Sequence, residues 1–136
     1  MQRSVINFPF KIERGWSEIT GIVKFSDAHI LLEIESTFLL VFKDIKEIRL
    51  ALADILDVKF RKGFFKNWGQ IEIRVNSLAK LHELPNRDGK IILKLQRDDF
   101  KRAREAIERL QKDLNEFHES LPPTQMPVSR LFNDED

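Results

Sequence analysis

Apolar and polar residues alternate with a period of two through six segments of the chain, the pattern of half-buried antiparallel strands. The segments are residues 20–25, 30–35, 47–52, 56–61, 71–76 and 91–96. Residues 26–29 predict a tight hairpin turn between the first two segments, and residues 53–55 predict a short link between the third and fourth. The pattern therefore predicts a mainly β domain with six or seven antiparallel strands.

Charge predicts the register of the hairpin formed by residues 56–61 and 71–76. Inward residues must face inward residues, and like charges directly opposite each other cost about 0.2–1 kcal/mol. Pairing Val58 with Ile73 leaves two outward pairs of opposite charge, Lys59 with Glu72 and Asp57 with Arg74. Slipping the strands by one allowed step puts like charges opposite each other instead. We therefore predict the first register.

The period becomes helical after the last strand, where Asp98 or Asp99 can cap a helix N-terminus. Apolar residues then recur at intervals of three and four and form one stripe, made of Phe100, Ala103, Ile107, Leu110, Leu114, Phe117 and Leu121. Pro122 and Pro123 end the helix. The stripe also suits a coiled coil, but the strands present many apolar faces that need cover. We expect this C-terminal amphipathic helix to pack on the sheet.

These patterns divide the chain into an N-terminal extension at residues 1–15, a folded domain at residues 16–119 and a flexible tail at residues 120–136. Between residues 76 and 89 leucines recur every three residues, so a short strand and a helical turn both remain possible. The tail carries four apolar residues, Met126, Val128, Leu131 and Phe132, that could instead dock on this domain or on a neighbour.

Composition narrows the classes of protein. The 136 residues include no cysteine, which excludes a disulfide framework and a thiol nucleophile. The first 16 residues lack the apolar run of a signal peptide, and no apolar run approaches the roughly 20 residues that span a bilayer. We expect a cytoplasmic protein. Lys and Arg number 23 and Asp and Glu 22, a net charge of +1 that argues against nucleic acid as the partner.

No arrangement of residues predicts catalysis. His29, His82 and His118 are scattered without metal-binding spacing, so we expect them at the surface. Glu33 and Glu35 share one outward strand face and could act as paired carboxylates, but such a pair is typical of a solvated sheet face. The five glycines form no phosphate-binding loop. We expect no enzyme activity, no cofactor, no metal ion and no small-molecule substrate.

Three stretches resemble a known family: EIRLALADILDVKFRKGFF at residues 47–65, IEIRV at 71–75 and GKIILKLQRDD at 89–99. They are similar to bacterial pleckstrin-homology-like (PH-like) and GRAM-like domains, which also place an Asp-Ile link before a basic strand, then a Gly-aromatic hairpin and a final strand that runs into a helix. The resemblance covers about residues 16–118. It implies a bent antiparallel barrel capped by the C-terminal helix, and a binding module without catalysis.

The eukaryotic lipid-binding PH domains hold inositol phosphates with several Lys and Arg residues around their first hairpin. Here residues 23–30 offer one lysine, Lys24, and one aspartate, Asp27. The chain departs from the pattern where the phosphates would lie. Binding of phosphoinositide headgroups is therefore not implied.

The hairpin at residues 59–69, KFRKGFFKNWG, stands out because aromatic residues occupy its predicted tip, where polar residues are usual. The aromatic residues could fold back and close the end of the barrel. They could also form an exposed patch for a protein partner, including a second copy. A third alternative is entry into an anionic membrane interface, with stacking on single-stranded nucleic acid as a lesser variant. The candidate contact residues are Lys62, Phe64, Phe65, Lys66 and Trp68.

The neutral net charge, the lack of a catalytic arrangement and the aromatic hairpin together favour a non-catalytic interaction module. Its expected partner is another protein or a second copy of the chain. The alternative is peripheral binding to anionic membrane lipid through the basic and aromatic hairpin 59–69.

Overall fold

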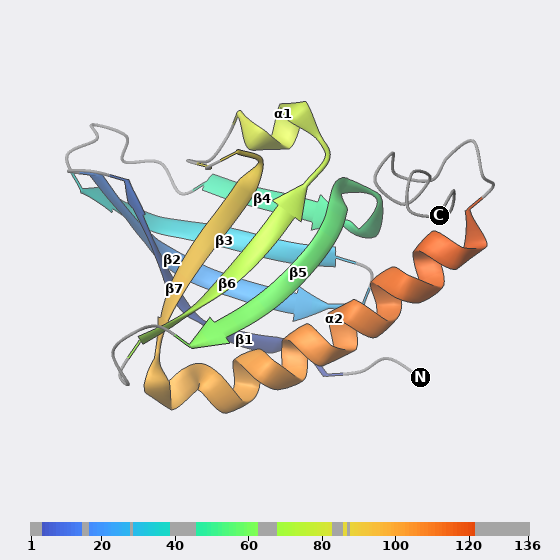
Figure 1. The fold of residues 1–136 in the computed structure, drawn as a ribbon. Coiled ribbons are helices and arrows are strands. Elements are labelled where there is room, and N and C mark those ends of the chain that lie inside the picture. Colours follow the sequence, from blue (N-terminus) through green and yellow to red (C-terminus); the bar gives the residue numbers. More distant parts are fainter. Residues whose placement is uncertain are drawn as a thin grey trace.

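The protein folds into one antiparallel sheet with a long helix packed against it (Figure 1). The structure is a computed structural model that describes residues 4–14, 17–27, 29–38, 46–62, 68–82, 86 and 88–121. Its seven strands are β1 (Ile6–Arg14), β2 (Ser17–Ser26), β3 (His29–Phe38), β4 (Lys46–Ala51), β5 (Ile55–Lys62), β6 (Trp68–Val75) and β7 (Lys90–Gln96). They lie in the order β4-β3-β2-β1-β7-β6-β5. The predicted fold class, mainly β with a C-terminal helix, is confirmed.

The first strand corrects the prediction of an N-terminal extension at residues 1–15, because Ile6–Arg14 forms β1. Its residues alternate as the other strands do, and Phe8, Phe10 and Ile12 are buried in the core. Pro9 lies within this strand and does not end it. A proline is tolerated here because β1 pairs with β2 along its length and has one registered pair with β7, Lys11 with Lys94.

The sheet bends sharply, so that β5–β7 cross in front of β2–β4 (Figure 1). One cause is a β-bulge between Thr20 and Gly21, where the register of β2 against β3 shifts. A Cβ atom at Gly21 would lie 2.1 Å from the backbone oxygen of Glu33. Only glycine therefore lets the two strands approach so closely at the bend.

The hairpin of β5 and β6 has the register that charge predicts. Val58 pairs with Ile73, and the outward pairs are Lys59 with Glu72 and Asp57 with Arg74. The last pair is an ion pair, with 3.0 Å between Arg74 Nη1 and Asp57 Oδ2. The short link before β5 is a 3-10 turn, η1 (Leu52–Asp54), in which the Asp54 carboxylate accepts a hydrogen bond from the Ala51 amide.

The C-terminal helix is α2 (Phe100–Ser120), preceded by a 3-10 turn, η2 (Arg97–Asp99). Asp99 stands at the N-cap position, but its buried carboxylate pairs with Arg102 and caps no amide. The predicted capping role of Asp99 is therefore wrong in detail, although the helix begins where expected. Pro122 lies outside the described residues.

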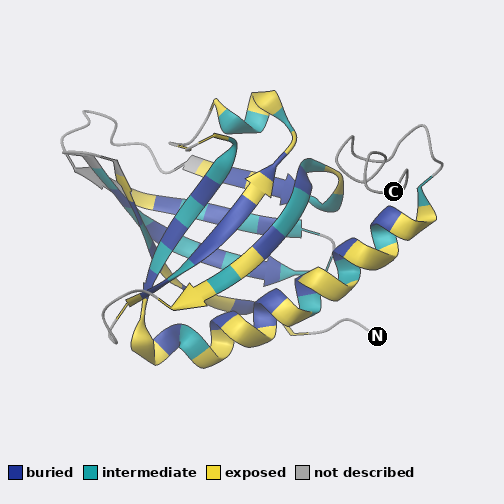
Figure 2. Cartoon of the chain, viewed as in Figure 1, coloured by how far each residue is buried: buried dark blue, intermediate teal, exposed yellow. Residues whose placement is uncertain are grey.

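One side of α2 is buried against the sheet, and the other faces outward (Figure 2). Ala103, Ile107, Leu110 and Leu114 are buried, as the stripe predicts. The coiled-coil alternative is not needed to cover them. At the helix end the burial differs from the prediction, because His118 is buried with 5% of its surface exposed, while Phe117 is half-buried. His118 is thus not a surface histidine.

The irregular segment after β6 contains one short helix, α1 (Leu78–Leu81), which settles the choice between a strand and a helical turn. Ser77 caps it by accepting a hydrogen bond from the Lys80 amide. Leu81 packs against the core, whereas Leu78 is exposed. Neither α1 nor α2 is both long and apolar enough to cross a membrane, and these are the α-helices of the described residues.

Candidate interaction surface

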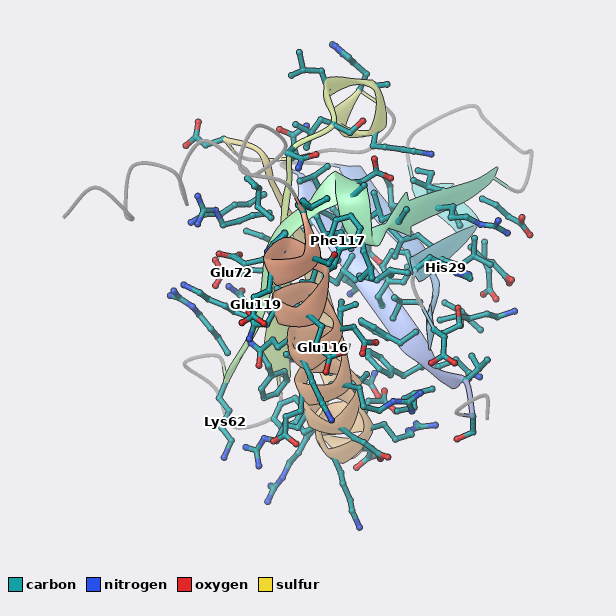
Figure 3. All side chains as sticks on the ribbon, turned by 90° about the vertical axis from the view of Figure 1, so that its right-hand side faces the viewer. His29, Lys62, Glu72, Glu116, Phe117 and Glu119 are labelled. Carbon is teal, nitrogen blue, oxygen red and sulfur yellow. The ribbon has the colours of Figure 1, made fainter. Side chains whose placement is uncertain are left out.

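The hairpin that the sequence singles out is described at its base. Lys62 at the end of β5 pairs with Gly69 of β6, and its side chain projects away from the sheet (Figure 3). Three of the five candidate contact residues, Phe64, Phe65 and Lys66, lie outside the described residues. The structure therefore places Lys62 and Trp68, one on each strand of the hairpin.

Trp68 lies on the outer side of the sheet, and 38% of its surface is exposed. Its neighbour Gly69 faces the core, so the side chain of Trp68 must point the opposite way. The Lys11 ammonium lies 5.3 Å from the centre of the indole ring, within the range of a cation–π contact. Trp68 also borders a shallow hollow of about 270 Å³ with Gln96, Arg97 and Asp98.

The inner side of the hairpin base is fixed to the start of α2. Phe60 and Phe100 meet edge to face, with ring centroids 5.3 Å apart, and the Arg104 guanidinium lies 5.6 Å from the Phe60 ring. A Cβ atom at Gly69 would lie 2.7 Å from the Phe100 ring. The glycine lets Phe100 pack directly on the β6 backbone, and this contact closes the core at the hairpin end.

The hairpin base continues into a broader charged surface, which we name the basic face. It consists of the outward side chains of β5, β6 and β7. Its cationic members are Lys59, Arg61, Arg74, Lys90 and Lys94, and its acidic members are Asp57 and Glu72. Five positive charges against two negative ones leave a formal excess of three. Trp68 lies at one end of this face.

Glu72 organises the centre of the basic face. Its carboxylate is nearly buried, with Oε2 2.6 Å from Arg61 Nε and Oε1 4.0 Å from Lys90 Nζ. The contact with Arg61 lacks the alignment of a hydrogen bond, so it acts as a close ion pair. An unpaired buried carboxylate is costly, and these two cations offset that cost. Glu72 therefore draws the Arg61 and Lys90 side chains toward the centre of the basic face.

A second group of charges joins β1 to β7. Lys94 Nζ donates a hydrogen bond of 2.7 Å to Glu13, and Lys11 Nζ lies 3.5 Å from Glu18. The hydrogen bond from Lys94 lowers the pKa of the Glu13 carboxyl below its ordinary value, and the charges of Lys94 and Lys11 act in the same direction. The two lysines are directly opposite each other. Each is drawn toward a different glutamate, which keeps the two ammonium groups apart.

The outward side chains of β2, β3 and β4 carry the opposite charge, and we name them the acidic face. The described acidic members are Glu18, Glu33, Glu35 and Glu47, and the cationic members are Lys24 and Arg49. Four negative charges against two positive ones leave an excess of two. Glu33 pairs with Lys24 at 2.6 Å. The two glutamates considered as paired carboxylates thus differ, since Glu33 is engaged and Glu35 is exposed.

The two charged faces lie on opposite sides of the molecule. Viewed along α2, Glu72 of the basic face projects to one side of the helix and His29, outward on β3, to the other (Figure 3). The neutral outer surface of β1 lies between them in the sheet order, because Lys11 and Glu13 balance there. The small net charge of the chain therefore conceals two surfaces of opposite sign.

The histidines and acidic residues form no group suited to hold a metal ion within the part of the chain that the structure describes. His29 hydrogen-bonds through Nε2 to the Ser26 hydroxyl at 2.9 Å, which fixes the β2–β3 turn. No protein-family model matches the chain, and no curated protein matches it in sequence. The basic face was missed in the sequence, although the strand alternation already placed its cations on one side.

Proposed function

We propose that this chain is a non-catalytic interaction module with a PH-like fold that binds a protein through the basic face and the hairpin beside it. The strand order supports the PH-like assignment, because β1 lies next to β7 and a C-terminal helix packs on the bent sheet. The observation that carries the binding role is the exposed Trp68 at the edge of a surface with three excess positive charges.

Both features are typical of binding surfaces. Tryptophan and arginine are enriched at the centres of protein interfaces, and an exposed tryptophan with a cation over its ring presents a large apolar area at low entropic cost. Lys11 and the basic face surround Trp68 with positive charge. Such a surface attracts a partner whose own surface is acidic.

A photo-cross-linking amino acid introduced at Lys62 tests the proposal in cells that make the protein. The matched control carries the same group at Lys112, which is exposed on α2 and belongs to neither the hairpin nor the charged faces. We expect a discrete protein adduct from position 62 and none from position 112. Equal adducts at both positions, or none at either, would contradict a binding surface at the hairpin.

The basic residues also favour a second candidate, an anionic membrane surface. Lys and Arg near a membrane each contribute about 1 kcal/mol to its attraction, and tryptophan prefers the interface. Sedimentation with vesicles of anionic and of neutral lipid separates the two candidates. Pelleting with anionic vesicles that salt abolishes supports the membrane, whereas no pelleting at low salt excludes it.

A further inference from the structure

The acidic face has a complement on the same chain. We propose that the partner of the basic face is the acidic face of a second copy, so that molecules associate head to tail. This inference rests on the protein-binding role proposed above and names the partner. It adds a second surface, on β2–β4, that the hairpin alone does not suggest.

The charges of the two faces complement each other. The basic face has an excess of three positive charges and the described acidic face an excess of two negative ones. Arranging opposite charges across an interface speeds encounter and disfavours other orientations. Two copies related by a symmetric contact of the basic face would instead bring like charges together.

Each face also keeps a pair of like charges that stability alone disfavours. Lys11 lies directly opposite Lys94 at the edge of the basic face, and Glu33 lies directly opposite Glu47 in the acidic face. Like charges at such positions destabilise a pair of strands by about 0.2–1 kcal/mol. Glu13 beside Lys94 and Lys24 beside Glu33 already offset part of these repulsions, and a face of opposite sign on a second copy would offset more.

Apolar side chains lie among the charges on both faces. Ile22 and Leu31 are half-buried on the outer side of β2 and β3, next to Glu33 and Lys24. Ile92 is half-buried beside Glu72 on the basic face, and Trp68 is exposed at its end. Protein interfaces combine such apolar side chains with charged ones.

The position of the faces decides the type of assembly. Because they lie on opposite sides of the molecule, a copy that uses its basic face still presents its acidic face (Figure 3). Such a heterologous contact continues from copy to copy and produces a ring or an open chain. The mass of the assembly should therefore rise with protein concentration and fall with salt.

Light scattering of the purified full chain and of two charge-reversed variants tests the inference. Lys59→Glu/Lys94→Glu reverses the basic face, and Glu35→Lys/Glu47→Lys reverses the acidic face. The matched controls make the same changes of charge on the exposed side of α2, as Lys101→Glu/Lys112→Glu and Glu108→Lys/Glu116→Lys. Circular dichroism checks that all four variants fold.

We expect the parent chain and both controls to associate at low salt, and each face variant to associate at least about tenfold more weakly. The decisive sample is an equal mixture of the two face variants. Each retains the face that the other lacks, so the mixture should regain the association that neither variant shows alone.

Three results would overturn the inference: a parent chain that stays monomeric at low salt, loss of association in the α2 controls, or a mixture that stays monomeric. These outcomes leave the proposed function testable by itself. A cross-linked adduct at position 62 with the mass of a different protein would support the binding surface and reject self-association. Binding of the monomeric chain to anionic vesicles through the basic face would reject it as well.

Discussion

Lys94 of β7 lies directly opposite Lys11 of β1, and this is the registered pair that connects the two strands. Two ammonium groups in that position repel each other. Each is drawn toward a different neighbour, Lys94 to Glu13 at 2.7 Å and Lys11 to Glu18 and the Trp68 ring. The connection between the two halves of the sheet therefore depends on carboxylates, and its strength should depend on pH.

Replacing Glu13 with glutamine should destabilise the fold at neutral pH and have no effect in acid. The pKa of Glu13 is lower in the folded chain than its ordinary value of 4.5, so the folded state favours the ionised carboxylate. The contribution is complete above that ordinary value and is lost as the pH falls through the lower folded value. For an exposed pair we expect about 0.2–1 kcal/mol at pH 7, measured by urea unfolding over a range of pH.

Glu35→Gln is the control for this pH dependence, because Glu35 is an exposed strand glutamate of the same type. At neutral pH its unfolding free energy should differ from that of the parent chain less than the Glu13→Gln variant does. A Glu13→Gln deficit that persists unchanged at the most acidic pH at which the parent chain still folds would contradict the assignment to the ion pair with Lys94.

Gly69→Ala should destabilise the hairpin base through steric conflict with Phe100. The new Cβ atom would lie 2.7 Å from the ring, and overpacking of this kind typically costs about 1–3 kcal/mol. The conflict is with the far end of the Phe100 side chain, so a shorter side chain at position 100 should relieve it. We therefore expect Gly69→Ala/Phe100→Leu to lose less stability than the sum of the two single variants, as a double-mutant cycle by urea unfolding would show.

Gln111→Ala should weaken the outer edge of the sheet at β5. Gln111 Nε2 donates a hydrogen bond of 2.8 Å to the Val58 carbonyl, and β5 is the last strand in the sheet order. Loss of one such bond costs about 0.5–1.5 kcal/mol of unfolding free energy. Lys112→Ala, at an exposed neighbouring position, should change stability much less. Equal losses in the two variants would indicate a helix effect instead.

The predictable parts of this fold are those where a residue's neighbours along the chain determine its environment. The alternation of apolar and polar residues predicted six strands. The pairing of opposite charges predicted the register that places Lys59 opposite Glu72. The stripe on α2 located most of the buried helix surface. β1 lies within the residues predicted as an N-terminal extension, and its place between β2 and β7 is a long-range property that its own residues do not determine.

The charged faces could not be predicted because they are assembled from strands distant in sequence. Lys59 and Lys94 belong to one surface only after β6 has been placed between β5 and β7. At the end of α2 the burial differs from the expectation, because His118 is buried and Phe117 is half-buried. The aromatic hairpin was chosen for its composition, and of its candidate contacts the structure places Lys62 and Trp68.

Glu47→Lys should stabilise the fold while it weakens association. Glu47 lies directly opposite Glu33, so lysine at this position replaces a like-charge pair with an opposite-charge pair worth about 0.2–1 kcal/mol. The same substitution removes one negative charge from the acidic face and adds one positive charge, so that its described acidic and cationic residues balance. Urea unfolding should therefore show a gain in stability, and light scattering at low salt a lower mass.

Glu47→Gln separates the two effects, since it removes the repulsion without adding a positive charge and should fall between the parent and the lysine variant in both measurements. A lysine variant that is more stable but associates as the parent does would show that the acidic face is not a contact surface. The negative charge at Glu47 would then weaken the fold without contributing to association.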